Sequence, residues 1–404
     1  MGKFRVRTYD AISPVGLRRF SADYTVASDV EQPDAIMLRS FNLHNQTIDD
    51  TVLAIGRAGA GVNNIPVDSM TERGVVVFNA PGANANSVKE LVVAGLLLAA
   101  RNLPAALSYA KSLPPQDMKK AVEQGKKQFA GNEISGGTLG VIGLGSIGYR
   151  VANTAVDLGM RVLGYDPGVK EHHAAELSAQ VHRVNSLERL LAESDFVTLH
   201  VPLTESTKNL LDGRRIALMQ RGAVLLNFAR DELVDESALI AALDSGDLRG
   251  YVTDFPNPTV HAHDKVIALP HLGASTSSAE DNCAVMIADE LQDFLENGNI
   301  RYSVNFPAVS LPRRGFRRLT LAHRNTPGVI AEFSRAISAA GINVVELIND
   351  CRGEYAYSIM EVEADTLPDS VVGQLERMPQ LLRLRILGEP NLRVTRGSSV
   401  SSAD

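Results

Sequence analysis

The sequence predicts an α/β protein with doubly wound parallel sheets, followed by a smaller ferredoxin-like module. Up to about residue 300, short apolar runs alternate with amphipathic stretches, as buried parallel strands do when helices connect them. A glycine-rich turn in the middle of the chain lies between one such strand and one such helix. Residues 319–387 then follow the order strand, helix, strand, strand, helix, strand, which is typical of a ferredoxin-like fold.

The size and composition of the chain favour a globular protein of several domains. Its 404 residues correspond to two or three domains, and 45% hydrophobic with 22% charged residues is ordinary for a folded chain. The apolar run 91–100 is about half a membrane span, and no apolar leader core follows Met1. The net charge of −7 disfavours nucleic acid and anionic membranes as partners. Cys283 and Cys351 form neither a disulfide framework nor a paired metal motif, so we expect a reducing cytoplasm and no metal.

The first part of the chain is predicted to contain buried strands at four apolar runs. They span residues 6–9, 35–38, 53–56 and 75–79. After them, Ser87 and Glu90 fit the capping-box pattern S-x-x-E, which predicts a buried helix over residues 88–101. Such a helix would lie in a core or at an interface between domains or subunits.

The middle of the chain continues this alternation. Strands are predicted at residues 138–143, 161–165, 196–200, 223–227, 250–253 and 266–268. Helices are predicted over residues 147–158 and 276–296, and a glycine follows the end of each.

Two later segments are predicted to be irregular. Residues 310–318 contain a proline, a glycine and four arginines, and we interpret them as a solvated hinge, with a polyanion site as the alternative. Residues 397–402 are rich in serine and are predicted to be disordered.

The glycine-rich turn, residues 143–148, fits the pattern G-x-G-x-x-G between a strand and a helix. Gly143 permits the tight turn, Gly145 lets the backbone approach a pyrophosphate, and Gly148 lets the helix pack on the strand. Asp166 ends the next strand, where a carboxylate accepts hydrogen bonds from an adenosine ribose and repels a 2′-phosphate. The motif therefore predicts a Rossmann domain that binds NAD rather than NADP, with a turn that binds no nucleotide as the alternative.

Four segments together carry a resemblance to a known family. They are residues 143–148 (GLGSIG), 195–204 (DFVTLHVPLT), 227–230 (NFAR) and 270–276 (PHLGAST). On these motifs the chain resembles the D-isomer-specific 2-hydroxyacid dehydrogenases over residues 35–305. The resemblance implies an NAD domain inserted into a discontinuous, flavodoxin-like substrate domain. The implied bounds are 1–86 and 283–308 for the substrate domain, 87–282 for the NAD domain, 309–318 for a linker, 319–390 for the C-terminal module and 391–404 for a flexible tail.

The same resemblance implies hydride transfer between the carbinol carbon of a hydroxy acid and NAD. His271 would move the hydroxyl proton, because imidazole exchanges protons near neutral pH. Arg230 would hold the substrate carboxylate with its planar guanidinium. Asp254 would contact the nicotinamide side of the cofactor. A core or capping histidine and a surface arginine are the alternatives for the first two residues.

The glutamate that supports this histidine in the family has no match in the sequence. Where a Glu-Pro pair is expected, the chain has Asn257-Pro258 in a shorter segment. The asparagine side chain can orient an imidazole but carries no charge. Asp264, the nearest downstream acid, is out of register. Three possibilities stay open: another acid fills the role, Asn257 orients His271, or the activity is low.

The resemblance also assigns binding residues to the cofactor and the substrate. Contacts with NAD fall on Gly143, Gly145, Ser146, Ile147, Gly148, Asp166, His200, Pro202, Ala229 and Asp254. Contacts with a phosphorylated substrate fall on Arg39, Ser40, Arg57, Ala58, Gly59, Asn84 and Lys126, with Asn86 and Lys127 as further candidates. The two arginines lie at strand ends, where α/β proteins bind ligands, and the lysine could come from a neighbouring subunit.

The C-terminal module resembles an ACT domain through residues 323–329 and 341–344. The resemblance implies an amino-acid ligand, taken as the feedback inhibitor L-serine, bound by His323, Asn325 and Asn343. A module that serves dimerisation alone is the alternative.

These patterns predict a cytoplasmic, NAD-dependent dehydrogenase of a small phosphorylated hydroxy acid, as a homodimer or homotetramer. One rival is a member of the same family that acts on another hydroxy acid. The other is a non-catalytic, NAD-sensing regulator, which the missing glutamate favours. His261 and His263 resemble a metal pair, but without a third ligand we interpret them as part of a loop.

Overall fold

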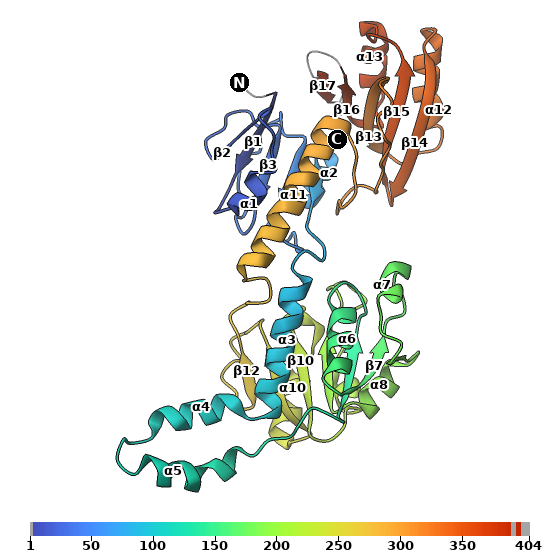
Figure 1. Cartoon of the computed structure of the whole chain (residues 1–404). Coiled ribbons are helices and arrows are strands. Elements are labelled where there is room, and N and C mark those ends of the chain that lie inside the picture. The colour runs from blue at the N-terminus through green and yellow to red at the C-terminus, as the bar shows by residue number, and fades with distance from the viewer. Residues whose placement is uncertain (1–2, 389–392, 397–404) are drawn as a thin grey trace, which may run out of the picture. The chain divides into compact units, whose positions relative to one another are not determined.

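The computed structural model describes residues 3–388 and 393–396, and the chain divides into two compact units (Figure 1). One unit comprises residues 1–83 and 280–404, and the other comprises residues 84–279. The changeovers at 83/84 and 279/280 precede the expected ones at 86/87 and 282/283 by three residues. The C-terminal module is part of the first unit, because it packs against the first sheet and its helix.

The first unit is built on a parallel sheet in the order β2-β1-β3-β4-β5. Its strands are β1 (Phe4–Thr8), β2 (Tyr24–Ala27), β3 (Ala35–Leu38), β4 (Ala54–Arg57) and β5 (Val76–Phe78). This is the flavodoxin-like order, in which ligands bind at the carboxyl ends of the strands. Strand β2 was not predicted, because Tyr24 is the one buried residue in it and no apolar run marks the strand.

Helix α11 (Ser277–Asn297) packs on this sheet through residues from Cys283 onward. Ala284, Ile287 and Leu291 belong to the same buried cluster as Val6 on β1. The helix approaches β4 closely at Gly56, where a Cβ would lie 2.4 Å from the Ile287 side chain. The short helices α1 (Pro14–Leu17) and α2 (Val67–Glu72) complete this part.

The second unit holds a parallel sheet in the order β12-β11-β10-β9-β6-β7-β8. Its strands are β6 (Thr138–Ile142), β7 (Arg161–Tyr165), β8 (Val181–Arg183), β9 (Phe196–Leu199), β10 (Ala223–Asn227), β11 (Leu248–Thr253) and β12 (Val266–Ala268). The connecting helices are α3 (Ala85–Ala100), α6 (Gly148–Asp157), α7 (Glu171–Ala175), α8 (Leu187–Glu193), α9 (Gly213–Ile216) and α10 (Glu236–Ser245). The order is that of a Rossmann fold, in which the strand order reverses between β6 and β9.

Helix α3 begins earlier than predicted. Asn84 precedes it without a side-chain capping bond, and Ser87 lies buried inside the helix rather than at its cap. The capping-box prediction is therefore wrong. Instead, the Asn86 side chain donates a hydrogen bond to Glu90, one turn further on (2.8 Å).

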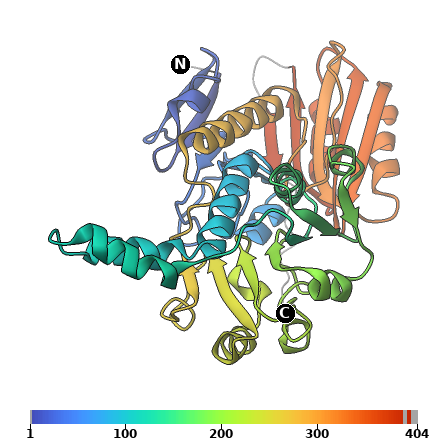
Figure 2. The same cartoon turned by 60° about the horizontal axis from the view of Figure 1, so that its bottom comes forward.

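Helices α4 (Leu103–Ser112) and α5 (Met118–Gly125) form a pair that extends away from the sheet of the second unit (Figure 2). Among the described residues, no single helix has the length and hydropathy of a membrane span, although α3 and α4 together pass that test as a pair bent by 66°.

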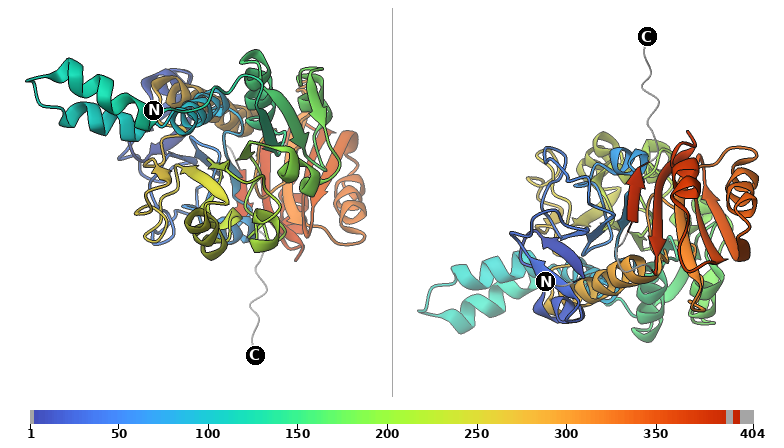
Figure 3. Two further views of the ribbon diagram at one scale, coloured as in Figure 1. Left: turned by 90° about the horizontal axis from the view of Figure 1, so that it is seen from below. Right: turned by 90° about the horizontal axis from the view of Figure 1, so that it is seen from above.

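The C-terminal module forms an antiparallel sheet in the order β14-β15-β13-β16-β17. Its elements are β13 (Arg317–Arg324), α12 (Val329–Ala339), β14 (Asn343–Arg352), β15 (Tyr355–Glu363), α13 (Asp369–Glu376), β16 (Leu381–Leu387) and β17 (Arg393–Arg396). Helices α12 and α13 cover one face of this sheet (Figure 3). The first six elements follow the predicted order. The prediction of a flexible tail is wrong for residues 393–396, which pair with β16, and the rest of that tail lies outside the described residues.

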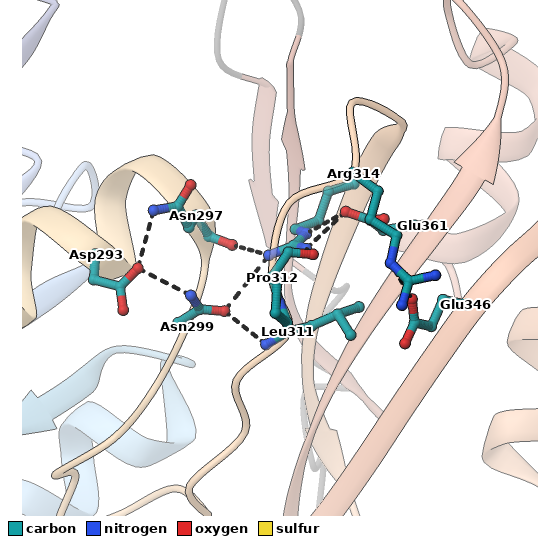
Figure 4. A network of polar contacts seen from close by, with 9 residues as sticks. Asp293, Asn297, Asn299, Leu311, Pro312, Arg314, Glu346 and Glu361 are labelled. Carbon is teal, nitrogen blue, oxygen red and sulfur yellow. Dashed lines mark hydrogen bonds and ion pairs between the residues drawn. The ribbon is translucent and has the colours of Figure 1, made fainter.

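The predicted hinge is also wrong at its C-terminal end. Arg317 and Arg318 belong to β13, and the Arg318 side chain is fully buried. Its guanidinium forms an ion pair with Glu361 (2.7 Å) and donates to the main-chain carbonyls of Asn297 and Pro312. These partners converge beside the end of α11 (Figure 4). The segment is therefore a packed joint rather than a solvated hinge.

Arg385 fastens the open face of the C-terminal sheet to helix α11. This buried side chain donates to the main-chain carbonyls of Phe294 (3.0 Å) and Leu295 (2.8 Å), in the last turn of the helix. The Phe294 carbonyl also accepts a hydrogen bond from the Gly298 nitrogen (2.8 Å). The carbonyls of this last turn carry the negative end of the helix dipole, so a cation stabilises them. The guanidinium also lies 4.4 Å from the centroid of the Phe294 ring.

Replacing Arg385 with methionine is expected to lower the free energy of unfolding by roughly 3 kcal/mol, because buried carbonyls lose charged donors. Urea unfolding monitored by circular dichroism would measure this change. Arg377→Met, at an exposed position on the same module, is the matched control and should leave stability within about 0.5 kcal/mol. Equal stabilities for the two variants would contradict the role given to Arg385.

Candidate active site

The glycine-rich turn follows β6 and leads into α6. Gly143 has φ +91°, and a Cβ there would lie 2.6 Å from the main-chain oxygen of His200. A Cβ at Gly148 would lie 1.8 Å from the main-chain oxygen of Gly143. Neither position therefore admits a side chain. Around Gly145, in contrast, no atom of the described residues, its two chain neighbours aside, lies within 4 Å of a Cβ position. Open space therefore meets the backbone where a pyrophosphate would approach.

Asp166 fixes the turn against the end of β7. One carboxylate oxygen accepts a hydrogen bond from the Leu144 main-chain nitrogen, and the other accepts one from Gly168 (2.8 Å each). The carboxylate therefore lies beside the turn, at the position predicted to meet the adenosine ribose. The glycine spacing, the open space and this carboxylate fit NAD.

His200 follows β9 and forms part of the wall behind the turn. Its Nε2 lies 3.0 Å from the Thr198 hydroxyl, and burial lowers the pKa of His200 to about 3. The imidazole is therefore neutral at physiological pH. Pro202 follows in the same loop, and its carbonyl accepts a hydrogen bond from the Thr207 hydroxyl.

Arg230 lies in the loop after β10, at the carboxyl edge of the sheet. The fully buried Asn227 shapes this loop: its amide donates to the Arg230 carbonyl (2.7 Å) and its oxygen accepts from the Ala229 nitrogen (3.1 Å). Asn227 belongs to the segment 227–230 but is not among the predicted site residues. Its place at the end of an apolar strand, directly before a charged loop, is a signal from which a structural role could be predicted.

Asp254 follows β11 and holds the next loop of this edge. The side chain is 1% exposed, and one of its oxygens accepts from the Gly273 nitrogen (3.0 Å). Its main-chain carbonyl accepts from the His271 nitrogen (2.9 Å). Burial raises the pKa of the Asp254 carboxyl, against the opposing effects of the Gly273 hydrogen bond and of the positive groups His271 and Arg230. The carboxylate therefore lies within electrostatic range of both predicted catalytic residues.

His271 has a strained backbone and an exposed ring. Its φ is +51°, a conformation that costs a non-glycine residue roughly 1–2 kcal/mol. The hydrogen bonds to Asp254 stabilise the loop in spite of that cost, and backbone strain of this kind clusters at functional sites. The imidazole packs against the Phe255 ring, with the centroids 4.6 Å apart.

Asn257 does not orient His271. Its side-chain oxygen accepts from the main-chain nitrogens of Thr259 (3.2 Å) and Val260 (2.9 Å) and so caps its own turn. Among the described residues, no hydrogen bond joins the His271 ring to a carboxylate, Asp264 included. One of the three possibilities left open by the sequence is thereby removed.

In the first unit, the predicted phosphate residues lie together at the carboxyl ends of β3 and β4. The Arg57 side chain donates to the Arg39 carbonyl (3.0 Å), and the Arg39 guanidinium pairs with Glu280 (2.7 Å). Ser40 donates its main-chain N–H to the Asp10 carboxylate (2.7 Å). Beside these groups, a Cβ at Gly59 would lie 2.4 Å from the Arg57 guanidinium. Ala58 is buried next to them.

Two other predicted substrate residues belong to the second unit. Asn84 immediately precedes α3, and its side-chain oxygen is buried without a partner among the described residues. Lys126 opens the short 3₁₀ helix η1 (Lys126–Phe129) and forms an exposed ion pair with Glu123.

The three predicted regulatory residues do not meet within one chain. His323 is fully buried, and its Nε2 lies 2.9 Å from the Ser358 hydroxyl, while burial lowers its pKa. Asn325, just beyond the end of β13, donates to the Gly353 carbonyl (3.2 Å). His323 lies opposite Ala356 on β15, whereas Asn343 lies opposite Glu363, seven positions further along. At about 3.3 Å per residue, the two ends are roughly 23 Å apart.

Comparison with known proteins shows which class of enzyme this chain belongs to. Residues 95–273 match the family described as "D-isomer specific 2-hydroxyacid dehydrogenase, NAD binding domain". The chain is 34% identical over 351 residues to the D-3-phosphoglycerate dehydrogenase of Escherichia coli strain K12, which covers 84% of this chain and 82% of that protein. The chain therefore belongs to the D-isomer specific 2-hydroxyacid dehydrogenases, and it is an NAD-dependent oxidoreductase.

More particular likenesses agree with this class. The D-3-phosphoglycerate dehydrogenase of Haemophilus influenzae is 34% identical over 350 residues, which are 83% of this chain and 81% of that protein. The NAD⁺-bound 3-phosphoglycerate dehydrogenase of Entamoeba histolytica superimposes with a TM-score of 0.58 at 25% identity, over 75% of this chain and 98% of that one. The TT0316 protein of Thermus thermophilus superimposes with a TM-score of 0.61 at 27% identity, over 74% and 99%.

Proposed function

We propose that this chain oxidises 3-phospho-D-glycerate to 3-phosphohydroxypyruvate with NAD⁺, the first step of L-serine biosynthesis. The choice of a phosphorylated substrate depends on one observation: Arg39 and Arg57 lie together at the carboxyl ends of adjacent strands. Two such cations could bind the phosphate group. The similarity to D-3-phosphoglycerate dehydrogenases supports the same substrate. Because Glu280 is paired with Arg39, the substrate phosphate would replace that carboxylate as its partner.

The site residues would divide the reaction among them. Bound NAD⁺ supplies the hydride acceptor. The guanidinium of Arg230 would hold the α-carboxylate in a bidentate pair and so orient the carbinol carbon. An imidazole nitrogen of His271 would take the hydroxyl proton as the hydride departs, so the hydroxy acid loses both and becomes the keto acid. Asp254 and Asn227 would keep these two groups in place.

Oxidation of NADH by the purified protein with 3-phosphohydroxypyruvate tests this proposal directly. Turnover at a rate above that with unphosphorylated hydroxypyruvate would support it. Turnover with other keto acids alone would instead establish the family member of different specificity. NADH binding without any turnover would favour the rival NAD-sensing regulator, for which the absence of a carboxylate bonded to His271 is the supporting observation.

Replacing Arg57 with alanine is expected to raise KM for the phosphorylated substrate at least tenfold, because one cation of the phosphate site is lost. KM for the unphosphorylated analogue should change less than twofold, which makes that analogue the internal control. Steady-state kinetics with both keto acids would measure the difference. A parallel rise in both KM values would contradict the assignment of Arg57 to the phosphate.

We propose further that L-serine inhibits the enzyme through the C-terminal module, taken as an ACT domain. Because His323 and Asn343 lie at opposite ends of one sheet, a site that used both would need a second copy of the chain. Repeating the assay with added L-serine tests the regulation. Unchanged turnover would mean that the module serves assembly or binds another ligand.

Apolar residues on α4 and α5 support the proposal of a homodimer or homotetramer. Leu103, Leu107, Met118 and Val122 are exposed on this helix pair. A second copy covering them would remove apolar surface from water. We also propose a cytoplasmic location, because Cys283 and Cys351 form no disulfide in the described part of the chain. Light scattering of the purified protein would measure the number of subunits.

A further inference from the structure

Phe255 lies between the two predicted catalytic side chains. Its ring centroid is 4.6 Å from that of the His271 imidazole, with the planes tilted by 45°. The Arg230 guanidinium lies 5.4 Å from the same centroid. The three residues come from the loops that follow β10, β11 and β12, which are neighbours in the sheet. Phe255 belongs to the middle loop and contacts a group from the loop on either side.

The backbone of Phe255 is held on both sides. Its N–H donates to the Thr253 hydroxyl (3.0 Å), and Thr253 itself is 1% exposed. Pro256 follows, and its ring restricts the preceding residue to extended conformations. Asn257 then caps the next turn with its side-chain oxygen. The phenyl ring therefore projects from a rigid segment and can act as a fixed platform.

The orientation of the His271 ring requires support from a neighbouring group. Among the described residues, no side chain forms a hydrogen bond with it, and its backbone has a strained positive φ. A proton acceptor must stay within hydrogen-bond reach of the substrate hydroxyl, so its orientation limits the rate. Contacts between aromatic rings, and between a guanidinium and an aromatic face, supply orientation without charge.

We propose that Phe255 is a positioning residue that orients His271 and Arg230 together, in place of a carboxylate bonded to the imidazole. The inference deepens the proposed function and rests on it for the roles of the two catalytic groups. Because one ring contacts both groups, its loss should disturb proton transfer and carboxylate binding at once. Tyrosine at this position keeps the aromatic platform, whereas leucine keeps the apolar bulk alone.

The first test is spectroscopic and needs no substrate. In protein with ¹³C-labelled histidines, the His271 ring signal, identified by its absence in His271→Gln, should be displaced by the Phe255 ring current. The displacement should disappear in Phe255→Leu and persist in Phe255→Tyr. An undisplaced His271 signal in the unmodified protein would overturn the proposal, whichever hydroxy acid proves to be the substrate.

The second test is kinetic. Phe255→Leu should lower kcat roughly tenfold, leave KM for NADH unchanged and raise the primary deuterium isotope effect from 4-deuterated NADH. Phe255→Tyr should stay within about twofold of the unmodified enzyme. In folded Phe255→Leu protein, a lower kcat with an unchanged isotope effect, or an unchanged kcat, would overturn the proposal.

A matched control lies elsewhere in the same sheet. Phe196, at the start of β9, has the Arg249 guanidinium 5.6 Å from its ring centroid, a similar contact away from the carboxyl edge. Phe196→Leu should therefore lower stability without changing the isotope effect or the His271 signal. If Phe255→Leu does not fold, the signal of the unmodified protein still decides the question. Absence of turnover with a displaced His271 signal would reject the proposed substrate and not the platform.

Discussion

Replacing His271 with alanine is expected to lower kcat about a thousandfold, the effect of removing a positioned acid–base group. KM for NADH should stay within about threefold, because the glycine-rich turn and Asp166 lie at other strand ends of the same sheet. In the direction of keto-acid reduction, the substrate oxygen would have to take its proton from water. Stopped-flow measurement of NADH oxidation, with fluorescence titration of NADH binding, would separate the two effects.

The control for this prediction is His182→Ala. His182 is an exposed residue of β8, at the edge of the sheet, and it should be replaceable without loss of rate. Retention of more than a tenth of the turnover in His271→Ala would show that another group moves the proton. The candidate would then be Asp254, whose buried carboxylate is near enough to affect both catalytic groups electrostatically.

The nucleotide-binding half was the most predictable part of the chain, because its signals are local. The spacing of Gly143, Gly145 and Gly148 reflects contacts with the next few residues and with one neighbouring strand, so a short pattern predicts both the turn and its use. Asp166 follows from the strand that comes next in sequence. The position of Arg230, three residues after an apolar strand, could likewise be predicted from local sequence.

The residues whose structural role was wrongly predicted have environments set by partners far away in the sequence. Arg318 looked like part of a solvated hinge, and it is buried because Glu361, 43 positions later, lies on the neighbouring strand β15. The sequence around Arg318 does not indicate an ion pair with Glu361. The local pattern around Ser87 predicts a helix cap, but in the structure the helix begins two residues earlier, at Ala85. Local patterns compete with packing, and at these positions packing is stronger.

In the candidate site, too, local features could be predicted from the sequence and distant contacts could not. His271 could be predicted from its motif, but its surroundings could not, since they are formed by three loops far apart in sequence. Phe255 reads as an ordinary apolar residue until the strand order brings its loop between those of Arg230 and His271. The predicted regulatory residues come from two separate segments, and only the antiparallel register shows that His323 and Asn343 lie at opposite ends of the sheet within one chain.

Replacing Arg230 with glutamine is expected to lower kcat/KM roughly a thousandfold, through both a higher KM and a lower kcat. Glutamine keeps hydrogen-bonding capacity but loses the charge and the paired donors that a carboxylate accepts. The loss in kcat is expected because, in the proposed role, the guanidinium would also orient the carbinol carbon toward the hydride acceptor. Steady-state kinetics with the keto acid and NADH would give both constants.

The structure offers a control and a further readout for Arg230. Arg221→Gln changes an exposed arginine before the same strand, β10, and should leave kcat/KM within twofold. In Arg230→Ala, added guanidinium ion should restore part of the rate, because the cavity left by the side chain borders the Phe255 ring that supports the natural group. A variant with raised KM and unchanged kcat would mean that Arg230 binds the carboxylate without orienting it. In that case the contacts of the substrate phosphate would have to position the carbinol carbon.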